Sequence, residues 1–324
     1  METYRLIGID IGGTKCAVTL GASRGGEIEI LDKTGFPTRS CPETLAALQD
    51  AVALILERNR LSVHDAAAIG ISCGGPLDSR RGVVLSPPNL PGWDGIPIVD
   101  ILQQRFGIPC ALQNDANACA LAEWLYGAGK GTRNMAFLTF GTGLGAGLIL
   151  DGKLYSGTND NAGELGHIRL EPFGPVGYGT AGSFEGFCSG GGIAQLARDR
   201  VKEELQMGRS VDWCPNGDPA QITALDVAQA MNGGDPLARS IFTTSARYLG
   251  RGLAILVDLL NPEVIVIGSI YARNEAVMRP VMEEILCQEA LAPAWSVCRV
   301  VPAALGERVG DYAALAVAAA SLAS

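Results

Sequence analysis

Residues 9–15 read IDIGGTK, and an apolar run stands on either side of them, at 6–9 and 16–20. Such runs are typical of short buried strands, so the stretch predicts a hairpin with Asp10 near the end of its first strand. Adjacent glycines let the turn approach a ligand closely, and their N–H groups can bind phosphate oxygens. The Asp10 carboxylate can hold a Mg²⁺ that binds phosphate, directly or through water. An ordinary glycine hairpin with a solvated aspartate would explain the same residues.

Length and composition describe a large globular chain. Its 324 residues suffice for two domains, and 48% hydrophobic with 18% charged residues allows a large core. The net charge of −9 disfavours nucleic acid and anionic membranes as partners, because such surfaces bind basic patches. We find neither a run long enough to span a bilayer nor a signal peptide. Nine scattered cysteines without a Cys-x-x-Cys pair are typical of a reducing compartment, so we expect a cytoplasmic protein.

Strand-like and helix-like segments alternate along the chain, which predicts an α/β fold. Ser40 and Glu43 form a capping box for one helix, and the Gly- and Pro-rich loops at 74–97 and 171–183 are long enough to carry function. Strand-like runs lie at 4–9, 16–20, 27–31, 67–72, 109–113, 135–140, 145–150, 263–267 and 297–301, and helical segments at 42–58, 116–126, 190–207, 236–259, 275–290 and 309–322.

A second glycine-rich loop, TFGTGLGAG at 139–147, follows the apolar run at 135–138. It predicts another strand-to-strand turn, and two such loops facing each other would clamp a nucleoside triphosphate. A glycine-kinked strand in a twisted sheet would explain the same residues. Two other glycine patterns are discarded: GKGT at 129–132 lacks a Ser or Thr directly after its lysine, and GYGTAG at 177–182 does not follow a strand.

Between these loops, an apolar run ends in Asn114 and Asp115, and a helix begins. Phosphorylating a hydroxyl requires a carboxylate within hydrogen-bond reach of the O–H, with Mg²⁺ and backbone donors around the developing charge. Asp115 suits the role of that general base, and Asn114 would orient the same substrate through both its donor and its acceptor. Asp115 would equally suit the role of a helix N-cap.

A third group of polar residues lies on glycine-bordered turns. Glu164 and His167 belong to AGELGH at 162–167, and Glu185 belongs to GSFEGFCSG at 182–190. Two carboxylates and an imidazole suit a polyol, since a carboxylate can accept hydrogen bonds from two neighbouring hydroxyls. A solvated or core-satisfied position would also explain each of them singly. With only two histidines in the chain, a His-rich metal site is excluded.

Together these segments resemble the ROK family of bacterial sugar kinases, within the actin-like ATPase superfamily. The resemblance implies a two-lobed, actin-like (ribonuclease H-like) α/β fold with an interdomain cleft. The small lobe would comprise 1–117 plus 305–324, and the large lobe 118–304. The resemblance covers nearly the whole chain and rests on DIGGTK at 10–15, GGPLD at 74–78, PNLPGW at 88–93, NDAN at 114–117, GTGLGAG at 141–147, GELGH at 163–167 and NPEVIVIGS at 261–269.

The resemblance also implies a role for each site residue. Asp115 would be the catalytic base, Asp10 would hold Mg²⁺ through water, and Gly268 would lie near the nucleoside. The sugar would be bound by Gly75, Asn89, Asn114, Asp115, Glu164, His167 and Glu185. The nucleotide would be bound by Asp10, Gly12, Gly13, Thr14, Lys15, Gly141, Thr142, Gly143 and Gly268.

The sequence departs from the family where many members bind zinc. Those members carry three cysteines ahead of the second sugar-binding glutamate, and here the three positions read Val176, Tyr178 and Ser183. A closed tetrahedral site needs four ligands, usually Cys or His, and His167 with Cys188 falls two short. We therefore expect no structural zinc.

The resemblance predicts transfer of the γ-phosphoryl group of ATP, with Mg²⁺, to a hexose hydroxyl, foremost the C6 hydroxyl of glucose. Relatives with similar motifs phosphorylate N-acetylmannosamine, N-acetylglucosamine, allose or fructose, so the sugar stays open. The family also includes sugar-sensing repressors with an N-terminal helix-turn-helix domain, for which the motif beginning at residue 10 leaves no room. A catalytically silent sugar-sensing regulator is the alternative from another class. We expect a homodimer, as is usual in relatives, with no nucleic-acid or membrane partner.

Overall fold

The computed structural model describes residues 3–322, and the chain divides into two compact units. Met1–Arg133, Gly147–Ala162 and Ala304–Ser324 form the first unit, and Asn134–Ala146 with Gly163–Ala303 form the second. This boundary differs from the predicted one, since 118–133 and 147–162 belong to the first unit. Among the described helices, none is both long and apolar enough to cross a membrane.

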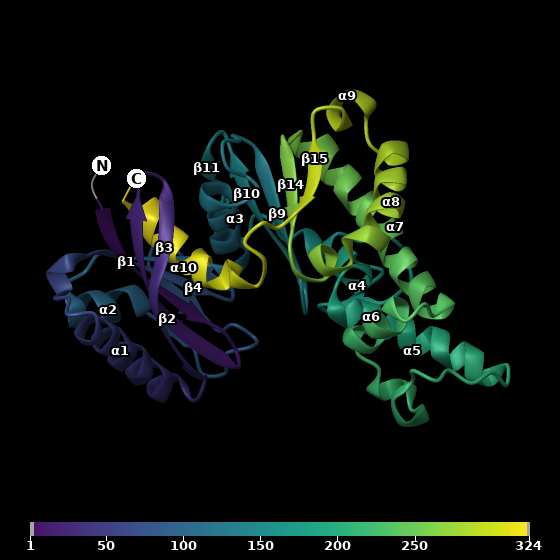
Figure 1. The fold of residues 1–324 in the computed structure, drawn as a ribbon, viewed down its shortest axis with the longest axis horizontal. Helices are drawn as coiled ribbons and strands as arrows, with labels where there is room; N and C mark the ends of the chain where they lie inside the picture. Colours follow the sequence, from purple (N-terminus) through teal and green to yellow (C-terminus); the bar gives the residue numbers. More distant parts are fainter. Residues whose placement is uncertain (1–2, 323–324) are drawn as a thin grey trace. The chain divides into compact units, whose positions relative to one another are not determined.

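The first unit is built on a five-stranded sheet with the order β3-β2-β1-β4-β8 (Figure 1). The strands β1, β2 and β3 pair antiparallel, while β4 and β8 continue the sheet parallel to β1. Parallel strands end at the same edge, and the register places Ile11 beside Cys73 and Cys73 beside Asn114. The strands are β1 (Thr3–Ile11), β2 (Lys15–Arg24), β3 (Glu27–Pro37), β4 (Ala66–Cys73) and β8 (Cys110–Asn114).

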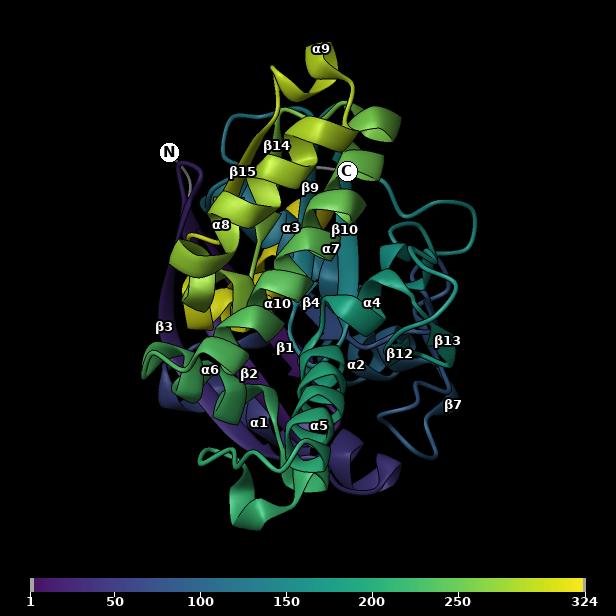
Figure 2. The same ribbon diagram turned by 90° about the vertical axis from the view of Figure 1, so that its right-hand side faces the viewer.

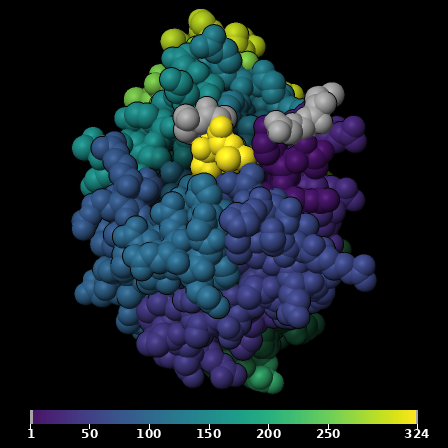
Figure 3. Space-filling view, turned by 90° about the vertical axis from the view of Figure 1, so that its left-hand side faces the viewer, coloured from purple at the N-terminus to yellow at the C-terminus, as the bar shows by residue number. Residues whose placement is uncertain are grey.

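Helices cover both faces of this sheet, because alternate residues of β1 point to opposite sides. Ile7, Ile9 and Ile11 belong to the large buried cluster that includes residues of α1 (Cys41–Arg58) and α2 (Ile98–Phe106). On the other face, Leu6 packs with Leu315 of α10 (Val309–Ser321), and α3 (Asp115–Tyr126) packs against α10. The space-filling view in Figure 3 shows C-terminal residues in yellow beside the purple surface of the first strands.

Glycines bring α10 unusually close to the sheet. A Cβ on Gly70 of β4 would lie 2.1 Å from the Ala314 carbonyl oxygen and 2.3 Å from the Ala318 nitrogen. A Cβ on Gly8 of β1 would lie 3.0 Å from the Ala314 Cβ. The alanine-rich face of the helix therefore rests directly on strand backbone, with no side chain between them.

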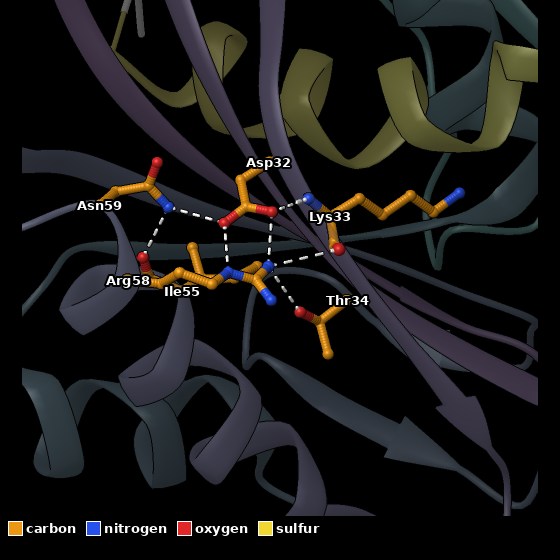
Figure 4. A network of polar contacts seen from close by, with 6 residues as sticks. All are labelled: Asp32, Lys33, Thr34, Ile55, Arg58 and Asn59. Atoms are coloured by element: carbon orange, nitrogen blue, oxygen red, sulfur yellow. Dashed lines mark hydrogen bonds and ion pairs between the residues drawn. The ribbon is translucent and has the colours of Figure 1, made fainter.

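A polar network around Asp32 joins the end of α1 to β3 (Figure 4). Arg58 Nε donates to Asp32 Oδ2 at 2.8 Å, and a second guanidinium nitrogen donates to Oδ1. Asn59 Nδ2 donates both to Asp32 Oδ2 at 2.7 Å and to the Ile55 carbonyl at 2.8 Å. The hydrogen bond from Arg58 is the main reason that the pKa of Asp32 lies below its ordinary value. This exposed network links the C-terminal end of α1 to the edge strand β3.

The long loop that begins at residue 74 contains a small antiparallel sheet, which the sequence analysis did not predict. Its strands are β5 (Leu77–Asp78), β6 (Val83–Leu85) and β7 (Asp94–Ile96). The fully buried Trp93 anchors it to the core of the first unit. Ser79 donates from its N–H and its hydroxyl to Asp160, at 2.8 Å in each case, which ties the loop to the segment 147–162.

The second unit carries most of a sheet with the order β11-β10-β9-β14-β15. Strand β10 (Leu144–Leu150) begins in the second unit and ends in the first, where it pairs with β11 (Lys153–Leu154). The remaining strands are β9 (Met135–Phe140), β14 (Val264–Ile267) and β15 (Arg299–Pro302), and a separate hairpin is formed by β12 (Val176–Gly177) and β13 (Thr180–Ala181).

Helices make up the rest of the second unit, and Figure 2 shows the two longest, α7 and α8, packed side by side. Strand β14, whose four residues are all apolar and fully buried, pairs with β9 on one side and β15 on the other. The helices are α4 (Phe184–Phe187), α5 (Gly190–Gln206), α6 (Ala224–Asn232), α7 (Pro236–Leu260), α8 (Ser269–Glu289) and α9 (Ala292–Trp295). Single 3₁₀ turns span 63–65, 165–167, 215–217, 219–221 and 306–308.

The close packing of α10 on the sheet yields a test of stability. We expect Gly70→Ala to lower the free energy of unfolding by about 1–3 kcal/mol or more, because the new methyl group meets backbone atoms that cannot rotate away. Gly35→Ala is the matched control, since its Cβ would lie 3.6 Å from the nearest atom, the Cys16 carbonyl oxygen. Urea unfolding measures both. Equal stability of the two variants would contradict the contact with α10.

Candidate active site

The turn at 12–14 joins β1 to β2 and is held in place by Thr38. The Gly12 N–H donates to the Lys15 carbonyl at 3.1 Å, which closes the turn. Thr38 Oγ1 donates to the Gly12 carbonyl at 2.6 Å, and the Thr38 N–H donates to the Thr14 carbonyl at 3.0 Å. The N–H groups of Gly13 and Thr14 have no acceptor among residues 3–322. The turn itself thus uses one of the two glycine N–H groups that the sequence analysis assigned to phosphate.

Asn89 lies directly against this turn. A Cβ on Gly13 would be 2.6 Å from the Asn89 carbonyl oxygen and 2.9 Å from the Asn89 Cβ. Gly13 is therefore required for this approach, and its φ is not positive. Gly75, the other predicted sugar residue of the first unit, follows the end of β4 and is exposed, with open space where a Cβ would be. The structure thus gathers both residues at the edge where β1 and β4 end.

Asp10 and Asp115 are the two carboxylates at this edge. Asp10 is half-buried, and its pKa is raised to about 6, mainly by burial and further by the charges of Asp115 and Asp311. Lys33, which forms an ion pair with Asp311, and a hydrogen bond with Ser72 act in the opposite direction. The three acidic groups repel one another, so an added cation at this edge would be stabilised.

The pKa of Asp115 is also raised, because the protein around its carboxylate removes water even though part of the residue is open to solvent. A hydrogen bond from the Ala116 N–H to its Oδ1, at 2.8 Å, partly offsets this effect. A carboxylate with a raised pKa is a stronger base once it is ionised. A raised pKa suits the predicted role of Asp115 as a general base, and that role stays a prediction.

Asn114, and not Asp115, caps helix α3. The Asn114 Oδ1 accepts from the Asn117 N–H at 2.7 Å, and Asp115 is the first residue of the helix. The alternative in which Asp115 serves as the N-cap is therefore wrong. The acceptor of Asn114 is engaged by the helix, so its NH₂ group is the part that is available to a substrate.

The second glycine loop lies in the second unit between β9 and β10. The Gly141 N–H donates to the Gly143 carbonyl at 3.1 Å, and the Gly190 N–H, at the start of α5, donates to the Gly141 carbonyl at 2.8 Å. The N–H groups of Thr142 and Gly143 have no acceptor in the described part of the chain. Each glycine loop thus presents two neighbouring N–H groups without a protein partner, which is the arrangement that binds an anion.

The remaining predicted sugar residues lie together in the second unit. Glu164 directly precedes a 3₁₀ turn whose last residue is His167. Both residues are exposed, and the His167 Nε2 lies 3.8 Å from Glu164 Oε2. Glu185 lies in the first turn of α4, and its Oε2 accepts from the Leu144 N–H at 2.9 Å. A Cβ on Gly166 would be 3.2 Å from the Glu185 Cβ, so α4 packs against the segment of Glu164 and His167.

The loop in which many relatives bind zinc is held by other contacts here. The side chain of Gln195 accepts from the Val176 N–H at 2.9 Å and donates to the Val176 carbonyl at 2.8 Å, which fixes the β12–β13 hairpin to α5. The ring of Tyr178 packs edge-on against His167, with 5.1 Å between centroids. Ser183 caps α4 by accepting from the Gly186 N–H at 3.0 Å. Within residues 3–322, no three His, Cys, Asp or Glu side chains are grouped to hold a metal ion.

Gly268, the predicted nucleoside contact, follows β14 and is buried. Its N–H donates to the Leu138 carbonyl at 3.0 Å, and a Cβ would be 3.4 Å from the Phe137 ring. Helix α8 begins at the next residue, six positions earlier than the sequence periodicity indicates, and it contains a kink at Asn274. The role of Gly268 toward a nucleoside stays a prediction.

Comparison with known proteins gives one consistent result. The model of the ROK family matches residues 6–321. A glucokinase of Streptomyces coelicolor is 35% identical over 263 residues, which cover 81% of this chain and 80% of that protein. The crystal structure of a ROK family glucokinase from Streptomyces griseus, in complex with glucose and AMPPNP, matches with a TM-score of 0.77 and 31% identity, covering 98% of this chain and 99% of that one. The DNA-binding transcriptional repressor Mlc of Escherichia coli is 32% identical over 240 residues, or 74% of this chain and 57% of the repressor. These matches confirm the predicted fold class, an α/β actin-like fold in two lobes.

The raised pKa of Asp10 predicts how its charge affects stability. Its folded-state pKa of about 6 exceeds the ordinary value of 3.8, so the fold loses stability as the pH rises from about 3.8 to about 6, and the full loss is present above about 6. We expect Asp10→Asn to raise the free energy of unfolding at pH 7.5 by about 1–3 kcal/mol without ligands, and to have little effect at pH 4. Urea unfolding at both pH values measures this difference. The control is Glu27→Gln, an exposed carboxylate on β3, and a matching pH dependence there would refute the role of burial.

Proposed function

Because the chain belongs to the ROK family, we propose that it is an ATP-dependent kinase that phosphorylates a hexose hydroxyl. The observation that carries this proposal is the position of Asp115. The pKa of its carboxylate is raised, and Asn114 caps the helix in its place. Asp115 directly follows β8, which pairs with β4, the strand that ends just before Gly75. A kinase requires such a base, whereas a protein that only binds sugar does not.

In the proposed reaction, Asp115 accepts the proton of the sugar hydroxyl while the hydroxyl oxygen attacks the γ-phosphorus of ATP. The bond from that phosphorus to the β,γ-bridging oxygen breaks, and ADP leaves with that oxygen. The NH₂ group of Asn114 would donate to a neighbouring sugar oxygen and so fix the orientation of the attacking hydroxyl. A positioned base of this kind typically contributes about 10²–10⁴-fold to the rate. The backbone supplies the remaining electrostatic stabilisation through the paired N–H groups of the glycine loops.

Phosphate binding is assigned to the two glycine loops, with Gly13 and Thr14 in one and Thr142 and Gly143 in the other. Lys15 follows the first loop and is exposed, so its ammonium group can reach a phosphate oxygen. Asp10 fits a hydrated Mg²⁺, because a carboxylate oxygen is a ligand that this ion prefers and the cation would relieve the acidic repulsion. Bound Mg²⁺ would neutralise charge on the transferred phosphoryl group.

Recognition of the sugar is assigned to the polar groups that the sequence analysis predicted. Glu164, His167 and Glu185 supply carboxylate and imidazole groups, while Asn89 and the exposed backbone around Gly75 supply further donors and acceptors. Glucose, phosphorylated at its C6 hydroxyl, is the foremost substrate because the Streptomyces relatives are glucokinases. N-acetylmannosamine, N-acetylglucosamine, allose and fructose are the alternatives.

The second candidate function is sugar sensing without catalysis. It is favoured by the match to the repressor Mlc, although the chain spans just over half of that protein's length. The two functions differ in what they do with ATP. A panel of hexoses and N-acetylhexosamines in a coupled ADP-release assay with Mg²⁺ therefore decides between them. We expect ADP release that depends on one sugar class, while sugar binding without any ADP release would establish the sensor.

The assignment of Asp115 leads to a specific variant. We expect Asp115→Asn to lower kcat by about 10²–10⁴-fold, because the amide cannot accept the hydroxyl proton, and to leave the dissociation constant of the sugar nearly unchanged. Steady-state kinetics and calorimetric sugar titration measure the two quantities. Asp100→Asn, an exposed carboxylate on α2, is the control and should retain full activity. Near-normal turnover of Asp115→Asn would show that another group is the base.

A further inference from the structure

The side chain of Glu185 is enclosed by glycines from three separate segments. A Cβ on Gly143 would lie 2.7 Å from Glu185 Oε2, one on Gly166 would lie 3.2 Å from Glu185 Cβ, and one on Gly177 would lie 2.8 Å from the same atom. These glycines belong to the second glycine loop, to the turn between Glu164 and His167, and to strand β12. All three of these segments thus approach the side chain of Glu185.

The carboxylate of Glu185 also forms a specific bond to the glycine loop. Its Oε2 accepts from the Leu144 N–H at 2.9 Å, directly after the two unpaired N–H groups of the loop. At the other end of the loop, the start of α5 holds the Gly141 carbonyl through the Gly190 N–H at 2.8 Å. The loop is therefore fixed on both sides, and only one of these contacts is made by an ionisable side chain. Glu185 Oε1 has no protein partner among residues 3–322.

We propose that Glu185 is a positioning residue for the phosphate-binding loop, in addition to its proposed contact with the sugar. One carboxylate oxygen holds the N–H groups of Thr142 and Gly143 in the geometry that binds phosphate, and the other is left for a sugar hydroxyl. This inference rests on the proposed kinase function, because it assigns the loop to nucleotide. Its consequence is that a residue of the sugar site controls nucleotide affinity even when no sugar is present.

Electrostatics alone predicts the opposite result. A carboxylate near a bound triphosphate repels it, so removing the charge of Glu185 would tighten nucleotide binding. If Glu185 positions the loop, its removal weakens nucleotide binding, because the loop loses a hydrogen bond to a charged group. The sign of the change therefore distinguishes the two effects.

The test compares three variants by calorimetric titration with the β,γ-imido analogue of ATP and Mg²⁺, in the absence of sugar. We expect Glu185→Ala to raise the dissociation constant of the analogue on the order of tenfold, since a hydrogen bond to a charged group is lost. Glu185→Gln keeps an acceptor of the same shape and should restore most of the affinity. Glu164→Ala is the matched control, a carboxylate of the same sugar site without a bond to the loop, and should leave the affinity unchanged.

Hydrogen exchange supplies a readout that needs no ligand. The Leu144 amide should exchange on the order of tenfold faster in Glu185→Ala than in the unsubstituted protein and in Glu164→Ala. Unchanged or tighter analogue binding by Glu185→Ala, or unchanged exchange of the Leu144 amide, would overturn the proposal. If the unsubstituted protein binds no analogue, the proposed kinase function fails, and the exchange measurement alone then supports or overturns the contact.

A second pair of variants tests the same contact if Glu185→Ala does not fold. In Gly143→Ala, the new methyl group displaces Glu185 Oε2, whereas in Gly141→Ala the nearest atom is 3.8 Å away, the Ser269 Oγ. We expect Gly143→Ala to speed exchange of the Leu144 amide and to weaken sugar binding measured without nucleotide. Gly141→Ala should change neither quantity. Identical behaviour of the two variants would count against the coupling of the loop to Glu185.

Discussion

The parallel pairing of β1, β4 and β8 is the constraint on which the first unit depends. Parallel strands bring their carboxyl ends to one edge of the sheet, and this edge carries Asp10, the first glycine loop, Gly75 and the Asn114–Asp115 junction. Segments that are far apart in the sequence thereby lie at one edge of the sheet. The sheet can pack this closely on α10 because β1 and β4 present glycine at the contact.

Gathering acidic groups at this edge has an energetic cost. Asp10 is half-buried beside two other carboxylates, and the resulting pKa of about 6 means that its charged form is disfavoured in the ligand-free protein. Ligands that bring cations would relieve the repulsion, so the same residues that destabilise the empty site would stabilise the occupied one. Strained electrostatics of this kind are common at functional sites, where activity and stability are selected together.

In the second unit, three irregular segments are held together, and no metal cluster is found among the described residues. Gln195 fixes the β12–β13 hairpin through both polar groups of Val176, and Tyr178 packs against His167. Around Glu185, three glycines lack the Cβ atoms that would crowd its side chain, and its carboxylate accepts from the Leu144 N–H. Hydrogen bonds of side chains to backbone therefore hold these segments together.

Local sequence pattern determined most of the elements. Long apolar runs and helical periodicity predicted every strand of the two large sheets except β11, and also six helices, because burial of one face leaves a repeating pattern in neighbouring residues. The motif spacing likewise predicted both glycine turns and the junction at Asp115. The short elements α2 and α6 and the sheet β5–β7 were missed, since each has too few residues for a clear period.

Only the tertiary structure decided how the site residues are used. Asn114, and not Asp115, is the N-cap of α3, and the Lys15 carbonyl accepts from the Gly12 N–H. Glu185 accepts from the N–H of Leu144, which lies 41 residues before it in the chain. The division of the chain also differs from the predicted one, because residues 118–126 belong to α3, which packs against α10 near the C-terminus, and residues 127–133 follow directly. In each case a hydrogen bond or a packing contact determined the partner, because the local sequence pattern did not distinguish that partner from others. Sequence periodicity reports which face of a segment is buried, but not which distant group will meet it there.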